Sequence, residues 1–69
     1  MTNPLKSLQH LARKSGAKII ITYYPISEDW FGEFGFGFQR PEIIVRDTNF
    51  TTMLQKLHCE VRKEMYDRL

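Results

Sequence analysis

The chain has 69 residues, of which 42% are hydrophobic and 26% are charged, and its formal net charge is +2. This length excludes a second domain, so residues 1–69 are expected to form one small globular unit. No fully apolar run is longer than that of Ile19–Ile21, which is far too short for a membrane span, and no membrane contact is expected. The single cysteine cannot form an internal disulfide, and the first residues do not resemble a secretory signal. Both features predict a cytoplasmic protein.

Charges of opposite sign are segregated along the chain. Residues 1–18 contain four basic residues and no acidic one, whereas residues 25–35 contain three acidic residues and no basic one. A net charge this small does not by itself drive strong nucleic-acid binding. The charge distribution therefore leaves open whether the partner is a protein or a nucleic acid.

A helix is predicted over residues 4–15. Asn3 is a suitable N-cap, Pro4 suits the first helical position, and Ser15-Gly16 supplies the end. One side of this helix is apolar. The other side carries a continuous basic stripe, which consists of Lys6, His10, Arg13 and Lys14.

Three strands are predicted next. Residues 18–24 are mostly β-branched or aromatic on both sides, which predicts a strand that is partly buried on both faces. Residues 25–29 break this pattern, and from Trp30 onward an aromatic face alternates with small residues. Arg40-Pro41 turns the chain into a third strand over residues 42–46.

A second helix is predicted from Phe50 to the end, because its apolar residues fall on one stripe: Phe50, Met53, Leu54, Leu57, Val61, Met65 and Leu69. The expected fold is α+β with the order αβββα. It has a three-stranded antiparallel sheet, and both helices pack on one face of that sheet.

This order resembles that of double-stranded-RNA-binding domains, and Pro4, Leu8, Lys14 and Gly16 stand at spacings similar to the opening of that family. The resemblance implies the fold. It also implies RNA contact through lysines at the start of the last helix and through the loop after the first strand. This sequence departs from the family at both places, because residues 47–52 contain no base and the loop is acidic.

The aromatic face formed by Phe34, Phe36 and Phe38 has two interpretations. It is similar to the stacking strand of cold-shock domains, and aromatic rings on an open strand can stack on bases. Apolar alternation more often marks a buried face, so these rings are expected to fill the core under the helices.

The sequence predicts no catalytic, metal or cofactor site. His58 and Cys59 are adjacent, and neighbours on a helix point about 100° apart, so the two side chains do not converge on one ion. Cys59 lies opposite the apolar stripe and is expected to be exposed.

Functionally, the sequence favours a small non-enzymatic protein-binding module, an inhibitor or adaptor of the kind that phages and mobile elements encode, which occludes its partner. The expected contact is an acidic loop with two large aromatic residues, formed by Glu28, Asp29, Trp30, Phe31 and Glu33. The alternative is an RNA or single-stranded DNA binder that uses the basic stripe. A homodimer is also expected, because so short a chain leaves apolar surface to cover.

Overall fold

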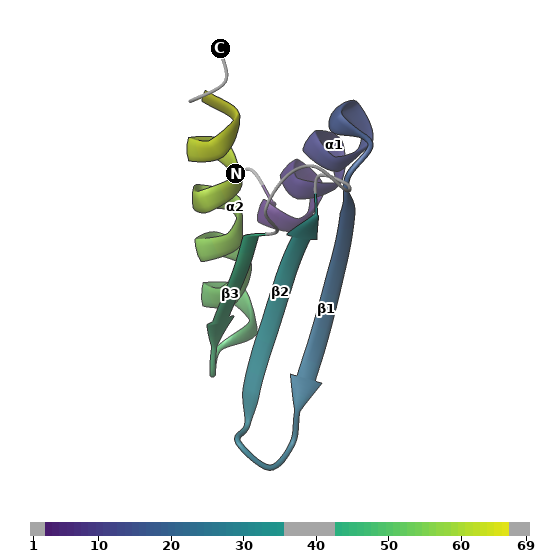
Figure 1. Ribbon diagram of the computed structural model, residues 1–69. Coiled ribbons are helices and arrows are strands. Elements are labelled where there is room, and N and C mark those ends of the chain that lie inside the picture. The colour runs from purple at the N-terminus through teal and green to yellow at the C-terminus, as the bar shows by residue number, and fades with distance from the viewer. Residues whose placement is uncertain (1–2, 36–42, 67–69) are drawn as a thin grey trace.

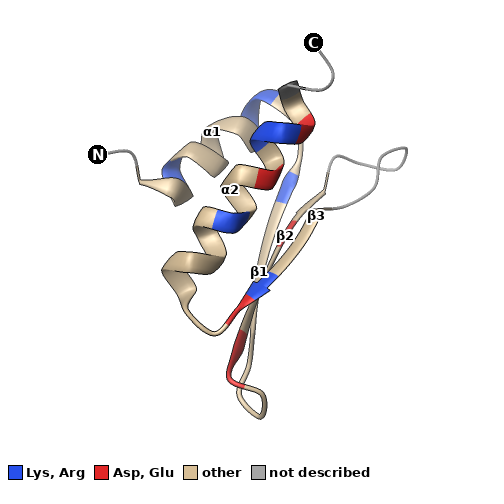
Figure 2. Ribbon diagram, turned by 90° about the vertical axis from the view of Figure 1, so that its left-hand side faces the viewer, with Lys and Arg blue, Asp and Glu red and all other residues tan. Residues whose placement is uncertain are grey.

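The computed structural model describes residues 3–35 and 43–66, and within them the chain forms two helices and one three-stranded sheet. The strand order is β1-β2-β3 with both pairs antiparallel, and both helices lie on the same face of the sheet (Figures 1 and 2). This confirms the predicted α+β fold. Neither described helix has the length and apolar character to cross a membrane. The elements are α1 Pro4–Ser15, β1 Lys18–Tyr24, β2 Asp29–Gly35, β3 Ile43–Asp47 and α2 Phe50–Tyr66.

Helix α1 begins and ends where its sequence predicts. The Oδ1 atom of Asn3 accepts a hydrogen bond of 2.9 Å from the backbone N–H of Leu5, which satisfies one of the free donors of the first turn. Gly16 ends the helix with φ 71°, a left-handed conformation that glycine adopts without a steric penalty. Leu8 and Ala12 are buried against the rest of the core.

The β1–β2 hairpin corrects the prediction for the acidic segment. All seven residues of β1 pair with β2, from Lys18 opposite Gly35 to Tyr24 opposite Asp29. The connecting turn is residues 25–28, one residue shorter than the predicted break over residues 25–29, and the strand predicted from Trp30 onward begins at Asp29. The interpretation of residues 28–33 as an acidic contact loop is wrong, because residues 29–33 belong to this strand. Strand β3 is described from Ile43 and ends one residue later than predicted, and Phe36, Phe38 and Glu42 lie outside the described residues.

The sheet face under the helices carries the core. Phe34 is fully buried, which confirms its expected place, and the predicted apolar stripe of α2 packs over β2 and β3. Ile43 and Val45 are partly buried against this cluster, as their alternation predicts, whereas Phe50 stays partly exposed and Leu69 lies outside the described residues. The buried residues are Leu8, Ala12, Phe34, Met53, Leu54, Leu57 and Val61.

Gly32, in the middle of β2, allows α2 to approach the sheet closely. A Cβ atom added at this position would lie 2.5 Å from Sδ of Met53 and 3.1 Å from Cδ2 of Leu57. Both of these side chains are fully buried. Because Gly32 has no side chain, Met53 and Leu57 of α2 can pack directly against the backbone of β2.

The start of α2 is fixed by hydrogen bonds from the residues before it. The Oδ1 atom of Asn49 accepts from the backbone N–H of Thr52 at 2.9 Å, and Oδ1 of Asp47 accepts from the N–H of Asn49 at 2.9 Å. The second carboxylate oxygen of Asp47 binds Nζ of Lys56 at 2.6 Å. The hydrogen bond from Lys56 and that from Asn49 lower the pKa of Asp47. Asp47 thus ties the end of β3 to the second turn of the helix.

We expect Gly32→Ala to destabilise the fold by about 1–3 kcal/mol, because the added methyl group overpacks the contact with Met53. The free energy of unfolding in urea measures this loss. The double variant Gly32→Ala/Met53→Ala should lose less than the sum of the two single variants, since the smaller side chain makes room for the methyl group. Strictly additive losses would contradict the close-approach explanation.

Asp47 predicts an acid-sensitive component of stability. A carboxyl whose pKa is lower in the folded chain stabilises the fold above its unfolded pKa of 3.8 and loses this contribution as the pH falls through the folded value. We expect Asp47→Asn to flatten the decline of stability below that pH, as followed by urea unfolding at successive pH values. Lys56→Gln should have a smaller effect of the same sign, because it removes the largest cause of the shift. An unchanged acid profile in Asp47→Asn would contradict this assignment.

Candidate interaction surface

The sheet face opposite the helices, here called the outer face, exposes several large apolar side chains. Ile20 is 49% exposed, Tyr24 50% and Ile44 55%, and no helix in the described part of the chain lies over them (Figure 2). Soluble monomers rarely gather apolar side chains on one open face unless the face binds something. Strand alternation assigns the outer face Lys18, Ile20, Thr22, Tyr24, Asp29, Phe31, Glu33, Gly35, Ile44 and Arg46.

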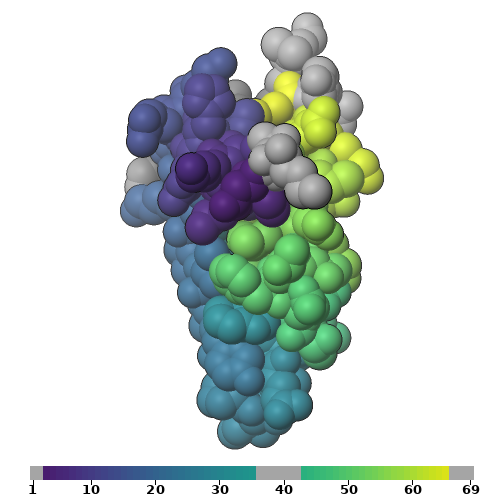
Figure 3. Space-filling view, turned by 180° about the vertical axis from the view of Figure 1, so that it is seen from behind, coloured from purple at the N-terminus to yellow at the C-terminus, as the bar shows by residue number. Residues whose placement is uncertain are grey.

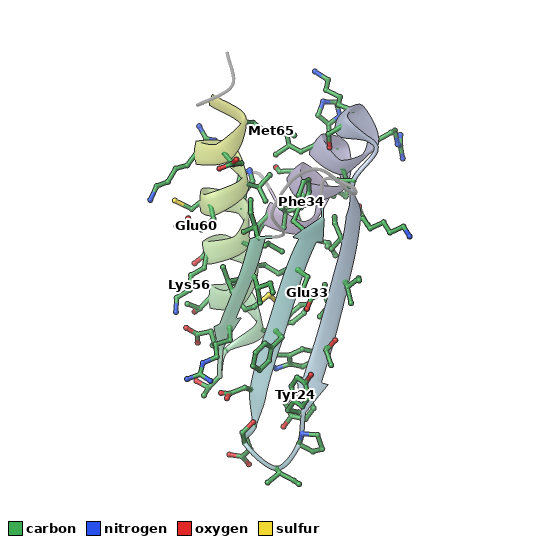
Figure 4. The ribbon with its side chains drawn as sticks, viewed as in Figure 1. Tyr24, Glu33, Phe34, Lys56, Glu60 and Met65 are labelled. Atoms are coloured by element: carbon green, nitrogen blue, oxygen red, sulfur yellow. The ribbon has the colours of Figure 1, made fainter. Side chains whose placement is uncertain are left out.

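Neighbouring side chains organise this outer face into rows across the sheet. Glu33 on the central strand pairs with Ile20 on one side and Ile44 on the other, so a single carboxylate lies between two exposed aliphatic side chains. The ring of Phe31 meets that of Tyr24 edge-on, with centroids 4.8 Å apart. Figure 4 looks onto this face, with Glu33 and Tyr24 labelled. The surface combines apolar and aromatic side chains with four charged residues: Lys18, Asp29, Glu33 and Arg46.

The tip of the β1–β2 hairpin extends the outer face beyond the helices (Figures 1 and 3). Ile26 in the turn is 100% exposed. Glu28 closes the turn with φ 56°, the left-handed conformation that non-glycine residues adopt at a cost of about 1 kcal/mol. Ile26 is therefore an accessible apolar side chain at the end of the hairpin.

The residues of the predicted acidic contact do not share one surface, because successive side chains of a strand point to opposite faces. Trp30 points to the helix side, where its ring lies 4.7 Å from that of Tyr23 and 4.7 Å from that of Phe50, centroid to centroid. Trp30 therefore closes the end of the core. The outer face brings together Asp29, Phe31 and Glu33, whereas Glu28 lies in the turn.

The basic stripe of α1 is exposed along its whole length, as predicted. Its last members lie at the same end of the molecule as Lys18, the first residue of β1. The acidic residues Glu28 and Asp29 lie at the opposite end of that strand (Figure 2). The separation of basic and acidic residues along the sequence therefore gives the hairpin a basic end and an acidic end.

The remaining candidate chemistry does not assemble into a site. Cys59 is exposed, as expected, and the neighbouring His58 is half-buried. Burial lowers the pKa of His58, and the charge of Arg62 lowers it further. Across residues 3–35 and 43–66, no three side chains of the metal-binding types come together.

Comparisons with protein-family models, with curated proteins and with solved structures found no match for this chain. The surface must therefore be interpreted from its own chemistry. Sequence reasoning missed Ile20, Tyr24 and Ile44 as surface residues. The signal was the apolar character of both sides of β1, from which partial burial on both faces was predicted. That expectation is wrong for the outer side, where Ile20, Thr22 and Tyr24 are all exposed.

Proposed function

We propose that the chain is a small non-enzymatic protein-binding module that contacts its partner through the outer face and the hairpin tip. In this proposal it acts as an inhibitor or adaptor by covering a surface of the partner. The observation that carries the proposal is the exposure of Ile20, Tyr24 and Ile44 on a sheet face without a covering helix in the described residues.

The composition of this surface supports a protein partner. Interfaces between proteins have an apolar, aromatic-rich centre with few charges, surrounded by polar residues. The outer face gathers apolar and aromatic side chains around Glu33, with Lys18 and Arg46 at its margins. The aromatic contact between Tyr24 and Phe31 is already formed in the free chain, which reduces the entropy lost on binding.

We expect Ile44→Lys to weaken partner capture roughly tenfold or more, because it replaces an exposed apolar side chain of the contact with an ammonium group beside Glu33. The test immobilises the chain, exposes it to an extract of the cells that produce it, and quantifies each retained protein by mass spectrometry. The matched control is Gln55→Lys, which adds the same charge at an exposed position of α2.

Both variants must show the wild-type thermal transition, so that loss of capture reports contact rather than folding. Trp30→Ala does not serve as a binding variant, because it removes the packing between Tyr23 and Phe50. Equal retention of the same proteins by Ile44→Lys and Gln55→Lys would exclude the outer face as the binding surface.

A second candidate function is nucleic-acid binding through α1. It is supported by the exposure of all four stripe residues, Lys6, His10, Arg13 and Lys14, and by the similarity of the element order to double-stranded-RNA-binding domains. The acidic hairpin tip and the absence of bases at the start of α2 oppose it. A protein-binding role is therefore preferred.

Fluorescence anisotropy with double-stranded RNA, single-stranded RNA and single-stranded DNA separates the two candidates. We expect no salt-sensitive binding at either low or moderate salt. Binding that weakens with salt, and that Lys6→Glu/Arg13→Glu abolishes while the exposed α2 variant Lys63→Glu retains it, would establish the nucleic-acid function instead.

A further inference from the structure

Strand β1 forms an edge of the sheet without the features that usually protect edges. In the described residues it pairs with β2 on one side only. Its seven paired residues run without a bulge or a proline, and its only charged residue is Lys18 at the start. Ile20, Tyr23 and Tyr24 on this strand are among the large apolar residues that stay exposed. Natural edge strands are normally shortened, bulged, or guarded by charges or proline.

The opposite edge of the sheet, strand β3, has the protective features that β1 lacks. Strand β3 has five residues, exposes Arg46, and ends in Asp47, which is bound to Lys56 of α2. A short strand with charges at its end is a poor template for pairing with another chain. The contrast marks β1 as the edge that is available for pairing.

We propose that β1 pairs antiparallel with β1 of a second copy of this chain, across a two-fold axis at Ile21, to form a six-stranded sheet. In this register Ile21 lies opposite its own counterpart. Ile20 lies opposite Thr22 of the second copy, and Lys18 lies opposite Tyr24. Each residue then meets one from the same sheet face, because the register keeps the alternation of both strands.

Charge complementarity favours a second copy of the chain as the partner of this edge. The basic end of β1 holds Lys18 and, in the last turn of α1, Arg13 and Lys14, whereas Glu28 and Asp29 lie at the other end. Antiparallel pairing brings the basic end of each copy next to the acidic end of the other. A parallel arrangement would instead put Lys18 beside Lys18.

The contact between Lys18 and the acidic end follows from the register. Asp29 pairs with Tyr24 inside one copy, and Lys18 of the second copy would lie on the other side of Tyr24. All three side chains are on the outer face. The spacing of about 10 Å across two strand intervals is within reach of the long lysine side chain. An unrelated peptide would need to reproduce this pattern, whereas a second copy carries it already.

The dimer does not depend on the proposed function, although it affects the same face. A two-fold axis perpendicular to the sheet leaves both outer faces on one side of the assembly. The exposed side chains of the two copies then form one continuous surface.

Sedimentation equilibrium under reducing conditions tests the proposal, since the reductant prevents cross-linking through exposed Cys59. We expect the unmodified chain to dimerise. The double variant Ile20→Lys/Thr22→Lys sets like charges opposite each other across the interface and should weaken the dimer roughly tenfold or more. Its matched partner Ile20→Lys/Thr22→Glu sets opposite charges at the same positions and should remain dimeric. Both sites are exposed, so neither variant removes core packing.

Three results would overturn the proposal. The first is a monomeric unmodified chain up to the limit of solubility. The second is equal dissociation of the two double variants, which contradicts the register. The third is loss of the dimer in Ile44→Lys, which changes the outer face but leaves the edge of β1 intact and would assign the interface to the face. A dimeric Ile44→Lys with impaired partner capture would separate dimerisation from the proposed binding function.

Discussion

The close approach of α2 to Gly32 is the constraint on which the rest of the structure depends. With a side chain at this position, Met53 and Leu57 would have to move away from the central strand. Their burial fixes α2 over β2 and β3, while α1 covers the β1 side of the same face. Both helices are thereby committed to one face of the sheet, and the other face keeps its apolar side chains exposed. The candidate surface is a consequence of how the core is packed.

The sequence predicts best what is decided locally. The bounds of α1 follow from Asn3 and Gly16, whose effects need no distant partner, and the limits of β1 follow from a dense β-branched run. The position of a helix over a particular strand is a tertiary property, so the role of Gly32 was not predictable from spacing. For the same reason, apolar residues on both sides of β1 predict burial without specifying what covers them.

The division of Trp30 and Phe31 shows how a small change of boundary alters a functional interpretation. A loop over residues 28–33 would allow both rings to point to one partner. A strand that begins at Asp29 separates them, because successive side chains point to opposite faces. Trp30 then completes the core beside Phe50, and Phe31 stays on the outer face with Tyr24. Aromatic pairs on both faces, Tyr23 with Trp30 and Tyr24 with Phe31, stabilise the tip end of the hairpin.

The separated charges have their effect between molecules rather than within one. Strand β1 spans about 20 Å between Lys18 and Tyr24, which exceeds the screening length of about 8 Å at physiological salt. The basic and acidic ends therefore attract each other only weakly inside one chain, and in the described residues no ion pair joins them. Their arrangement contributes little to the stability of the monomer. It becomes favourable when a second molecule approaches in the opposite direction, because the long Lys18 side chain can then bring its ammonium group close to the Asp29 carboxylate of the other copy.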